Sequence, residues 1–187
     1  MRITGGKAKG RQLSSPKGMD IRPTSDRVRE AIFSIIGQDL TGLRVLDLFA
    51  GTGSLGLEAL SRGAQHAVFI DNSQQSIELI KANLTLCRYQ ESGTILRRDL
   101  KKEGFLSHPV LQQGFDLIFL DPPYGKDLIT PLLEKISTTG VLSKWTRVVA
   151  ELSKTEKLPR AIGNLVMEDT RIYGDTGITI YSNEVTS

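Results

Sequence analysis

The sequence predicts an α/β fold in which a mainly parallel, seven-stranded sheet is covered by helices on both faces. Apolar runs typical of buried strands alternate with helix-like segments between residues 43 and 152, which is the pattern of parallel strands joined by crossover helices. A glycine-rich turn follows the first of these strands, and an Asp follows each of the next three. Because ligands bind at the carboxyl ends of strands in open α/β sheets, these turns are the expected site.

Four helices are predicted from the spacing of apolar residues. The first begins near Ser25 or Asp26, which are both good N-terminal caps, and ends at Gly37. Its apolar side chains recur at helical spacing as a single stripe, made of Val28, Ala31, Ile32, Ile35 and Ile36. The other helices are expected at 54–62, 73–86 and 128–136.

Seven strands are predicted from short apolar or alternating runs. They are expected at 43–49, 67–70, 94–97, 117–120, 147–152, 162–173 and 178–181. The residues at 174–177, Gly-Asp-Thr-Gly, have the turn chemistry of a β-hairpin, so the last two strands should pair antiparallel at one edge. Residues 101–114 show no clear pattern and are expected to form an irregular link.

The composition indicates one well-cored globular domain with a small extension. The chain has 187 residues, of which 39% are apolar and 24% are charged. We expect a basic arm or hairpin at 1–24 and a single domain at 25–187. No apolar run is long enough to span a bilayer, and the first residues lack the apolar core of a signal peptide.

The single cysteine, Cys87, cannot form an intrachain disulfide and fits a reducing compartment. With only two histidines in the chain, a Cys/His zinc cluster is excluded and no metal is expected.

Basic side chains are concentrated near the N-terminus. Residues 1–29 carry eight Lys or Arg and two Asp, a formal charge of +6, so the rest of the chain sums to −3 within the net charge of +3. A basic arm on a mildly acidic body suggests a polyanionic partner. A solvated tail without a partner is the alternative.

The turn after the first strand contains Gly51, Gly53 and Gly56, and Asp71 follows at the distance typical of a dinucleotide site. This fingerprint alone would indicate NAD, or a tight turn without a ligand. Asp47, at the end of the first strand, argues against NAD because a carboxylate there repels pyrophosphate and attracts a cation. S-adenosylmethionine carries an ammonium and a sulfonium and no phosphate, so it fits better.

Two further carboxylates, those of Asp71 and Asp99, follow the next two strands and are expected at the same edge of the sheet as Asp47. Asp71 suits the two ribose hydroxyls, since a carboxylate can accept from both. Asp99, just after the third strand, is placed to accept from the adenine amine. Each Asp alone is more often a turn former, but three at successive strand ends match S-adenosylmethionine.

The chemistry is expected after the strand at 117–120, where Asp121, Pro122, Pro123 and Tyr124 follow. The prolines have no amide proton, so the chain must leave the sheet there. The motif fixes a carboxylate, a carbonyl and an aromatic ring at a strand end. A strand cap with a buried Tyr is the alternative.

These three groups suit methylation of an exocyclic base amine. The Asp121 carboxylate and the Pro122 carbonyl can hold both N–H groups and aim the nitrogen lone pair at the methyl group, while Tyr124 stacks on the base. Orientation of this kind contributes roughly 7–11 kcal/mol, more than the roughly 1.5–3 kcal/mol of a hydrogen bond to a charged acceptor. The base would have to be unstacked or flipped out.

Together these motifs resemble those of the class I S-adenosylmethionine-dependent methyltransferases, and Asp-Pro-Pro-Tyr marks the amino-methylating members. Further motifs narrow the resemblance to the RsmD family: Arg-Ile-Thr-Gly-Gly at 2–6, Gly-Arg at 10–11, Arg-Pro-Thr at 22–24, and the runs at 26–31, 47–53 and 55–59. That family methylates the N2 amine of one guanine in bacterial small-subunit (16S) ribosomal RNA. The resemblance therefore implies a Rossmann-like class I methyltransferase fold and this activity.

The resemblance also implies which residues form the site. The catalytic residues would be Asp121, Pro122, Pro123 and Tyr124. The cofactor would be bound by Asp47, Phe49, Ala50, Gly51, Thr52, Gly53, Asp71, Asn72, Asp99 and Leu100. The RNA would be bound by Arg2, Lys7, Lys9, Arg11, Arg22, Thr24 and Arg27.

The expected partner is ribosomal RNA within the assembling or assembled small subunit. A monomer in the cytoplasm, with no membrane and no metal, is expected. Three alternatives stay open: an adenine-N6 methyltransferase of DNA or RNA, an NAD-dependent oxidoreductase, and a non-catalytic RNA-binding assembly factor.

Overall fold

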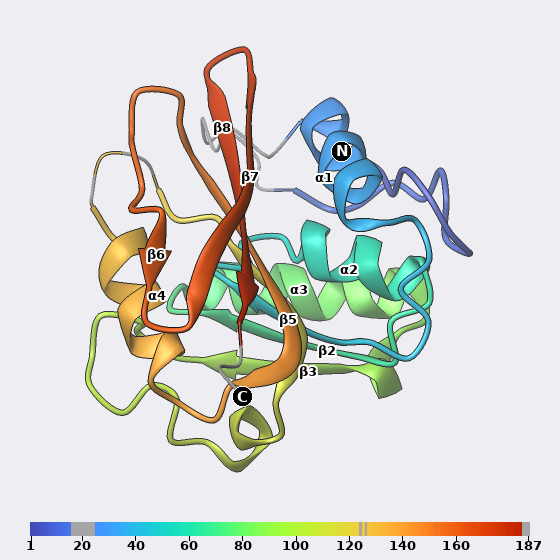
Figure 1. Cartoon of the computed structure of the whole chain (residues 1–187). Coiled ribbons are helices and arrows are strands. Elements are labelled where there is room, and N and C mark those ends of the chain that lie inside the picture. Colours follow the sequence, from blue (N-terminus) through green and yellow to red (C-terminus); the bar gives the residue numbers. More distant parts are fainter. Residues whose placement is uncertain (16–24, 124, 126, 185–187) are drawn as a thin grey trace. The chain divides into compact units, whose positions relative to one another are not determined.

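The chain folds as two compact units, Met1–Arg98 and Asp99–Ser187. The computed structural model (Figure 1) describes residues 1–15, 25–123, 125 and 127–184.

Three residues of the expected site lie outside the described residues. They are Arg22 and Thr24 among the RNA contacts and Tyr124 among the catalytic residues. The division into an arm at 1–24 and a domain at 25–187 stays a prediction.

The first unit is built on three parallel strands covered by helices. Its elements are α1 (Asp26–Ile36), β1 (Arg44–Leu48), α2 (Ser54–Ser61), β2 (His66–Asp71), α3 (Gln74–Cys87), the 3-10 turn η1 (Gln90–Ser92) and β3 (Gly93–Arg97). The strand β2 lies between β1 and β3 and is parallel to both, with Leu46 beside Val68 and Val68 beside Thr94. All three strands therefore end at the same edge.

The helix α1 begins where its sequence predicts, because the Ser25 hydroxyl accepts a hydrogen bond from the Val28 amide at 3.2 Å. Its buried face differs from the predicted stripe. Arg29 and Phe33 are buried, while Ala31 and Ile35 are only half-buried. The apolar pattern predicted the buried face of α1 incorrectly, because the pattern leaves out charged side chains and Arg29 is buried in an ion pair with Glu58.

Residues 1–13 form a hairpin on the first unit. Arg2 and Gln12 make an antiparallel bridge, and the Ile3 amide donates to the Arg11 carbonyl at 3.0 Å. Ile3 and Leu13 are buried, so the hairpin has its own apolar contacts with the unit.

The second unit contains five strands and one α-helix among its described residues. Its elements are the 3-10 turn η2 (Pro109–Gln112), β4 (Phe115–Leu120), α4 (Ile129–Ser137), β5 (Leu142–Ser153), β6 (Ala161–Ile162), β7 (Leu165–Tyr173) and β8 (Thr176–Asn183). The strands β4 and β5 are parallel, whereas β5, β8, β7 and β6 follow one another in antiparallel pairs.

The predicted count of seven strands was wrong, since the described residues contain eight. The run predicted as one strand at 162–173 is split at Gly163, whose φ of +55° turns the chain, and Ile162 then pairs with Leu165. The strands β5 and β8 also extend beyond 147–152 and 178–181. No described helix is long and apolar enough to cross a membrane.

Candidate functional site

The loop after β1 has a strained left-handed backbone. Phe49 has a φ of +62°, Gly51 of +56° and Gly53 of +78°. A bulky residue at positive φ is uncommon and costs about 1–3 kcal/mol, and such strain clusters at ligand-binding sites. The loop is bonded to the neighbouring strand β2, because the Ala50 amide donates to the Ile70 carbonyl at 3.0 Å.

Gly53 and Gly56 allow the loop and α2 to lie close to β2. Gly53 is the left-handed residue that caps α2, and it has no side-chain capping bond. A Cβ atom at Gly56 would lie 2.3 Å from Cε1 of Phe69, closer than any real contact. A side chain at position 56 would therefore push α2 off the strand and displace the loop.

Asp47 braces the start of α2 from the end of β1. It is 1% exposed, and its Oδ2 accepts a hydrogen bond from the Gly56 amide at 2.9 Å. Desolvation raises the pKa of Asp47 to about 7; the bond from Gly56 lowers the pKa, and the charge of Asp71 raises it. An amide at a helix start is often a donor to a bound anion. Here the Gly56 amide already donates to Asp47, so it does not serve as a donor to a phosphate.

We expect the stability of the Asp47→Asn variant, relative to the parent, to rise between pH 5 and pH 7 and to level off above pH 8. The folded pKa lies above the unfolded value of 3.8, so the parent loses stability as pH rises through that range. Asparagine does not titrate and can still accept from Gly56. Urea unfolding of both proteins at each pH measures the difference, and a difference independent of pH would contradict the expectation.

Asp71, at the end of β2, holds the loop with both carboxylate oxygens. Oδ2 accepts from the Gly51 amide and Oδ1 from the Ser73 amide, each at 2.9 Å. Asp71 is half-exposed, and each oxygen keeps a free lone-pair direction for a hydroxyl donor. Asn72 is exposed, and its carbonyl accepts from Arg97.

Asp99 and Leu100 belong to the second unit. Asp99 is half-exposed and its Oδ1 accepts from the Lys101 amide at 3.0 Å, which is the bond of a turn-forming Asp. Leu100 is 5% exposed. Their role in binding adenine stays a prediction.

Asp121 and Pro122 follow directly after the buried strand β4. Leu120 is 1% exposed and lies beside Ala150 of β5, so the next residue stands at the carboxyl edge of two parallel strands. Asp121 is half-exposed, Pro122 is buried and Pro123 is exposed. Asp121 is thus partly accessible to solvent, although it stands between the buried Leu120 and the buried Pro122.

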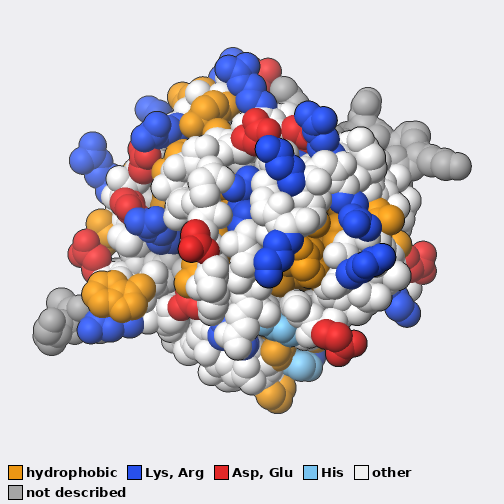
Figure 2. Space-filling model, turned by 90° about the vertical axis from the view of Figure 1, so that its right-hand side faces the viewer, with side chains coloured by type: hydrophobic (Ala, Val, Ile, Leu, Met, Phe, Trp, Pro, Cys, Tyr) orange, Lys and Arg blue, Asp and Glu red, His pale blue; other side chains and the backbone are white. Residues whose placement is uncertain are grey.

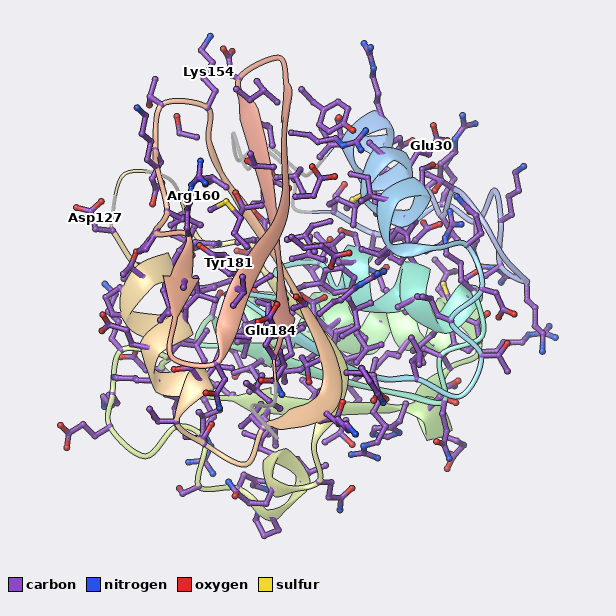
Figure 3. The ribbon with its side chains drawn as sticks, in the orientation of Figure 1. Glu30, Asp127, Lys154, Arg160, Tyr181 and Glu184 are labelled. Carbon is purple, nitrogen blue, oxygen red and sulfur yellow. The ribbon has the colours of Figure 1, made fainter. Side chains whose placement is uncertain are left out.

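The segment after β5, residues 154–160, carries three exposed cations, Lys154, Lys157 and Arg160. Figure 3 labels Lys154 and Arg160 on it. The buried Tyr181 of β8 donates its hydroxyl to the Pro159 carbonyl at 2.6 Å, which fixes this segment. Desolvation raises the pKa of Tyr181 to about 12, so the phenol stays a donor. The sequence patterns did not identify this segment.

The expected RNA contacts of the hairpin are exposed on the first unit. Arg2, Lys7 and Lys9 are exposed, and so is Arg27 on α1. Arg11 is also exposed, but its guanidinium donates to the Leu86 carbonyl at 2.6 Å. Figure 2 shows Lys and Arg side chains spread over the face that it draws, with Asp and Glu between them.

Comparison with known proteins identifies the family. The family model described as "Conserved hypothetical protein 95" matches residues 1–182. The chain belongs to this family, the RsmD family of methyltransferases. The ribosomal RNA small subunit methyltransferase D of Escherichia coli is 32% identical over 187 residues, covering 98% of this chain and 90% of that protein.

The protein YlbH of Bacillus subtilis is 40% identical to this RsmD-family chain over 181 residues, which cover 97% of the chain and 98% of YlbH. The solved structure of yhhF from Escherichia coli is 28% identical, with a TM-score of 0.83 over 100% of this chain and 99% of that one. These matches confirm the predicted α/β, class I methyltransferase fold.

As an RsmD-family methyltransferase, the chain uses S-adenosylmethionine as its cofactor. The loop fits a group without phosphate, because Asp47 already occupies the Gly56 amide and places a carboxylate at the helix start. It also fits a ribose, because Asp71 retains lone pairs for two hydroxyls. Among the described residues, no cluster of His, Cys, Asp or Glu could hold a metal ion.

Sequence reasoning missed a buried charge cluster in this RsmD-family chain, made of Arg29, Glu58 and Arg62. Glu58 is 0% exposed, and its carboxylate lies 3.4 Å from Arg29 Nε and 2.8 Å from a terminal nitrogen of Arg62. The same carboxylate accepts from the Thr4 amide at 2.8 Å and the Gly5 amide at 2.7 Å. Glu58 therefore fastens the hairpin to α2. The available signal was an acid and an arginine within the family motifs, Glu58 and Arg29.

Proposed function

We propose that this chain transfers a methyl group from S-adenosylmethionine to the exocyclic N2 amine of a guanine in bacterial small-subunit (16S) ribosomal RNA. The observation that carries the proposal is that Asp121, which is half-exposed, and Pro122 follow directly after the buried strand β4. Membership in the methyltransferase family and the name of the Escherichia coli relative support the choice of ribosomal RNA.

In this proposal the chain contributes mainly orientation. S-adenosylmethionine supplies an already activated methyl group. The Asp121 carboxylate and the Pro122 carbonyl accept the two N–H groups of the base amine, which turns the nitrogen lone pair toward the methyl carbon. The carboxylate also stabilises the positive charge that develops on nitrogen, by about 1.5–3 kcal/mol. Stacking of the base on Tyr124 stays part of the proposal.

Adenine N6 is the nearest rival, because two acceptors at a strand end suit either amine. Guanine is preferred because the resemblance of the motifs to the RsmD family implies it, not because of these two acceptors. In both cases the base must leave its stack, at a cost of a few kcal/mol.

The deciding experiment uses labelled S-adenosylmethionine and small ribosomal subunits from a bacterial strain whose own methyltransferase of this family has been deleted. We expect one labelled N2-methylguanosine, located by nuclease digestion and mass spectrometry. Methylation of adenine, or label in DNA only, would overturn the proposal. Protein-free 16S RNA in a parallel reaction tests whether the assembling or assembled subunit is the substrate.

We expect the Lys7→Gln, Lys9→Gln double variant to bind this RNA more weakly and with a flatter salt dependence. Each lost phosphate contact reduces the slope of log K against log salt by about 0.7–0.9, so the double variant should lose roughly 1.4–1.8. Filter binding at several salt concentrations measures the slope. Lys144→Gln, which removes one exposed charge near the start of β5, is the control for a lysine outside the hairpin and should keep the slope of the parent. An unchanged slope in the double variant would show that Lys7 and Lys9 do not contact RNA.

The proposal includes three further points. The partner is RNA of the assembling or assembled small subunit, the protein acts as a monomer, and it acts in the cytoplasm, where ribosomes are built. Ultracentrifugation of the free protein tests the second point.

A further inference from the structure

The hairpin is connected to the cofactor loop mainly through the side chain of Asn83 on α3; the Thr52 hydroxyl also makes one weak bond, at 3.9 Å, to the sulfur of Met1. Oδ1 of Asn83 accepts from the Ser14 amide at 2.7 Å, and its Nδ2 donates to the Ser14 carbonyl at 3.0 Å. The same Nδ2 donates to the carbonyl of Thr52 at 2.9 Å. Asn83 is therefore hydrogen-bonded both to Ser14, the residue that follows the hairpin, and to Thr52 in the loop after β1.

The orientation of this amide is fixed by its partners. The Ser14 amide needs an acceptor and the two carbonyls need donors, so a flipped side chain would lose all three bonds. Asn83 is 0% exposed and Thr52 is 8% exposed. Because water has little access, loss of the amide would leave the Thr52 carbonyl buried without this donor.

The hairpin has other anchors that do not involve the loop. Glu58 holds Thr4 and Gly5, and the Ser61 hydroxyl accepts from the Ala8 amide at 2.9 Å. A change at Asn83 should therefore leave the hairpin docked while it cuts the bond to Thr52.

We propose that Asn83 is a positioning residue that couples RNA binding by the hairpin to cofactor binding by the loop, so that each ligand raises the affinity for the other. This inference rests on the proposed function, because it takes the hairpin as an RNA contact. RNA that orders Ser14 also fixes the Asn83 amide and, through it, the Thr52 carbonyl between Gly51 and Gly53. A loop that is already ordered loses less freedom when the cofactor binds.

The coupling is measured with S-adenosylhomocysteine, which cannot donate a methyl group. Its dissociation constant is determined by calorimetry with and without saturating small subunits that lack the modification. For the parent protein we expect the subunits to lower the constant at least fivefold, within the usual range of coupling. In Asn83→Leu, which has the same branched side-chain shape and makes none of the three bonds, the ratio should fall below twofold.

The ratio of the dissociation constants without and with subunits distinguishes coupling from damage to the fold. Partial unfolding would weaken cofactor binding equally in both measurements and leave the ratio unchanged. Thr85→Val is the matched control on the same helix, since the exposed Thr85 donates its hydroxyl to Lys81 of α3. It should keep the ratio of the parent. Equal ratios in the parent and Asn83→Leu, or a lost ratio in Thr85→Val, would overturn the inference.

Hydrogen exchange on the unaltered protein provides a test that needs no variant to fold. S-adenosylhomocysteine should slow exchange at the Ser14 amide as well as at the Gly51 amide of the loop. If the compound slows exchange at the Gly51 amide but not at the Ser14 amide, the proposed coupling through Asn83 is wrong, while the proposed function is unaffected. If the compound protects neither segment and calorimetry detects no binding, the proposed function itself fails.

Discussion

Replacing Asp121 with alanine is expected to reduce methyl transfer by about 10³-fold or more while cofactor affinity changes less than about twofold. Loss of the charged hydrogen bond removes roughly 1.5–3 kcal/mol, a factor of about 10 to 150. A base amine held by one acceptor is also misplaced, which costs about 10²-fold more. Single-turnover methylation and calorimetry with S-adenosylhomocysteine measure the two quantities.

Two controls define what this result means. Asp121→Asn keeps one carbonyl acceptor, so its rate should lie between those of the parent and the alanine variant. Asp116→Asn changes an acid at the opposite end of β4, where the Asp116 carboxylate accepts from the Ser143 hydroxyl at 2.9 Å, and it should keep the parent rate. An alanine variant that methylates as fast as the parent would remove Asp121 from the catalytic role.

Replacing Glu58 with alanine is expected to lower the free energy of unfolding by about 3–5 kcal/mol, the usual cost of breaking a buried ion pair from one side. The change leaves the guanidiniums of Arg29 and Arg62 buried without this carboxylate. It also removes the acceptor for Thr4 and Gly5. Since small proteins are stable by only about 5–15 kcal/mol, this is a large fraction of the total.

Urea unfolding of the parent and Glu58→Ala proteins measures this loss. Glu78→Ala is the matched control, because Glu78 is exposed on α3 and accepts from Gln74; it should change stability by less than about 0.5 kcal/mol. Limited proteolysis should also cut the Glu58→Ala variant first within residues 1–15. Equal stability of the two variants would show that the buried cluster does not hold the unit together.

Local patterns in the sequence predicted most of the helices and strands. The cap at Ser25, the apolar run at 67–70 and the stop before Pro122 each act over a few residues, and the structure has α1, β2 and the end of β4 there. The split at Gly163 was missed because a two-residue strand has too few side chains to form a pattern.

The contacts that hold the candidate site together could not be predicted in this way. Glu58 and Asn83 lie on helices whose other buried residues are mostly apolar, and the partners that they hold within residues 1–15 are 53 to 69 residues away in sequence. Only the fold brings such residues together. The buried Arg29 is not part of the predicted apolar stripe for the same reason, since its carboxylate partner Glu58 lies on another helix.

The docked hairpin has a consequence for synthesis on the ribosome. Residues 1–15 are translated before α2 and α3, so 54 residues separate Thr4 from Glu58 and 69 residues separate Ser14 from Asn83. At the usual elongation rate of about 5–20 residues per second, the basic segment stays without its anchors for roughly 3–14 s. During that time the nascent chain presents Lys7, Lys9 and Arg11 beside the ribosome's own RNA on an undocked segment, and folding of α2 and α3 then fixes that segment on the protein surface.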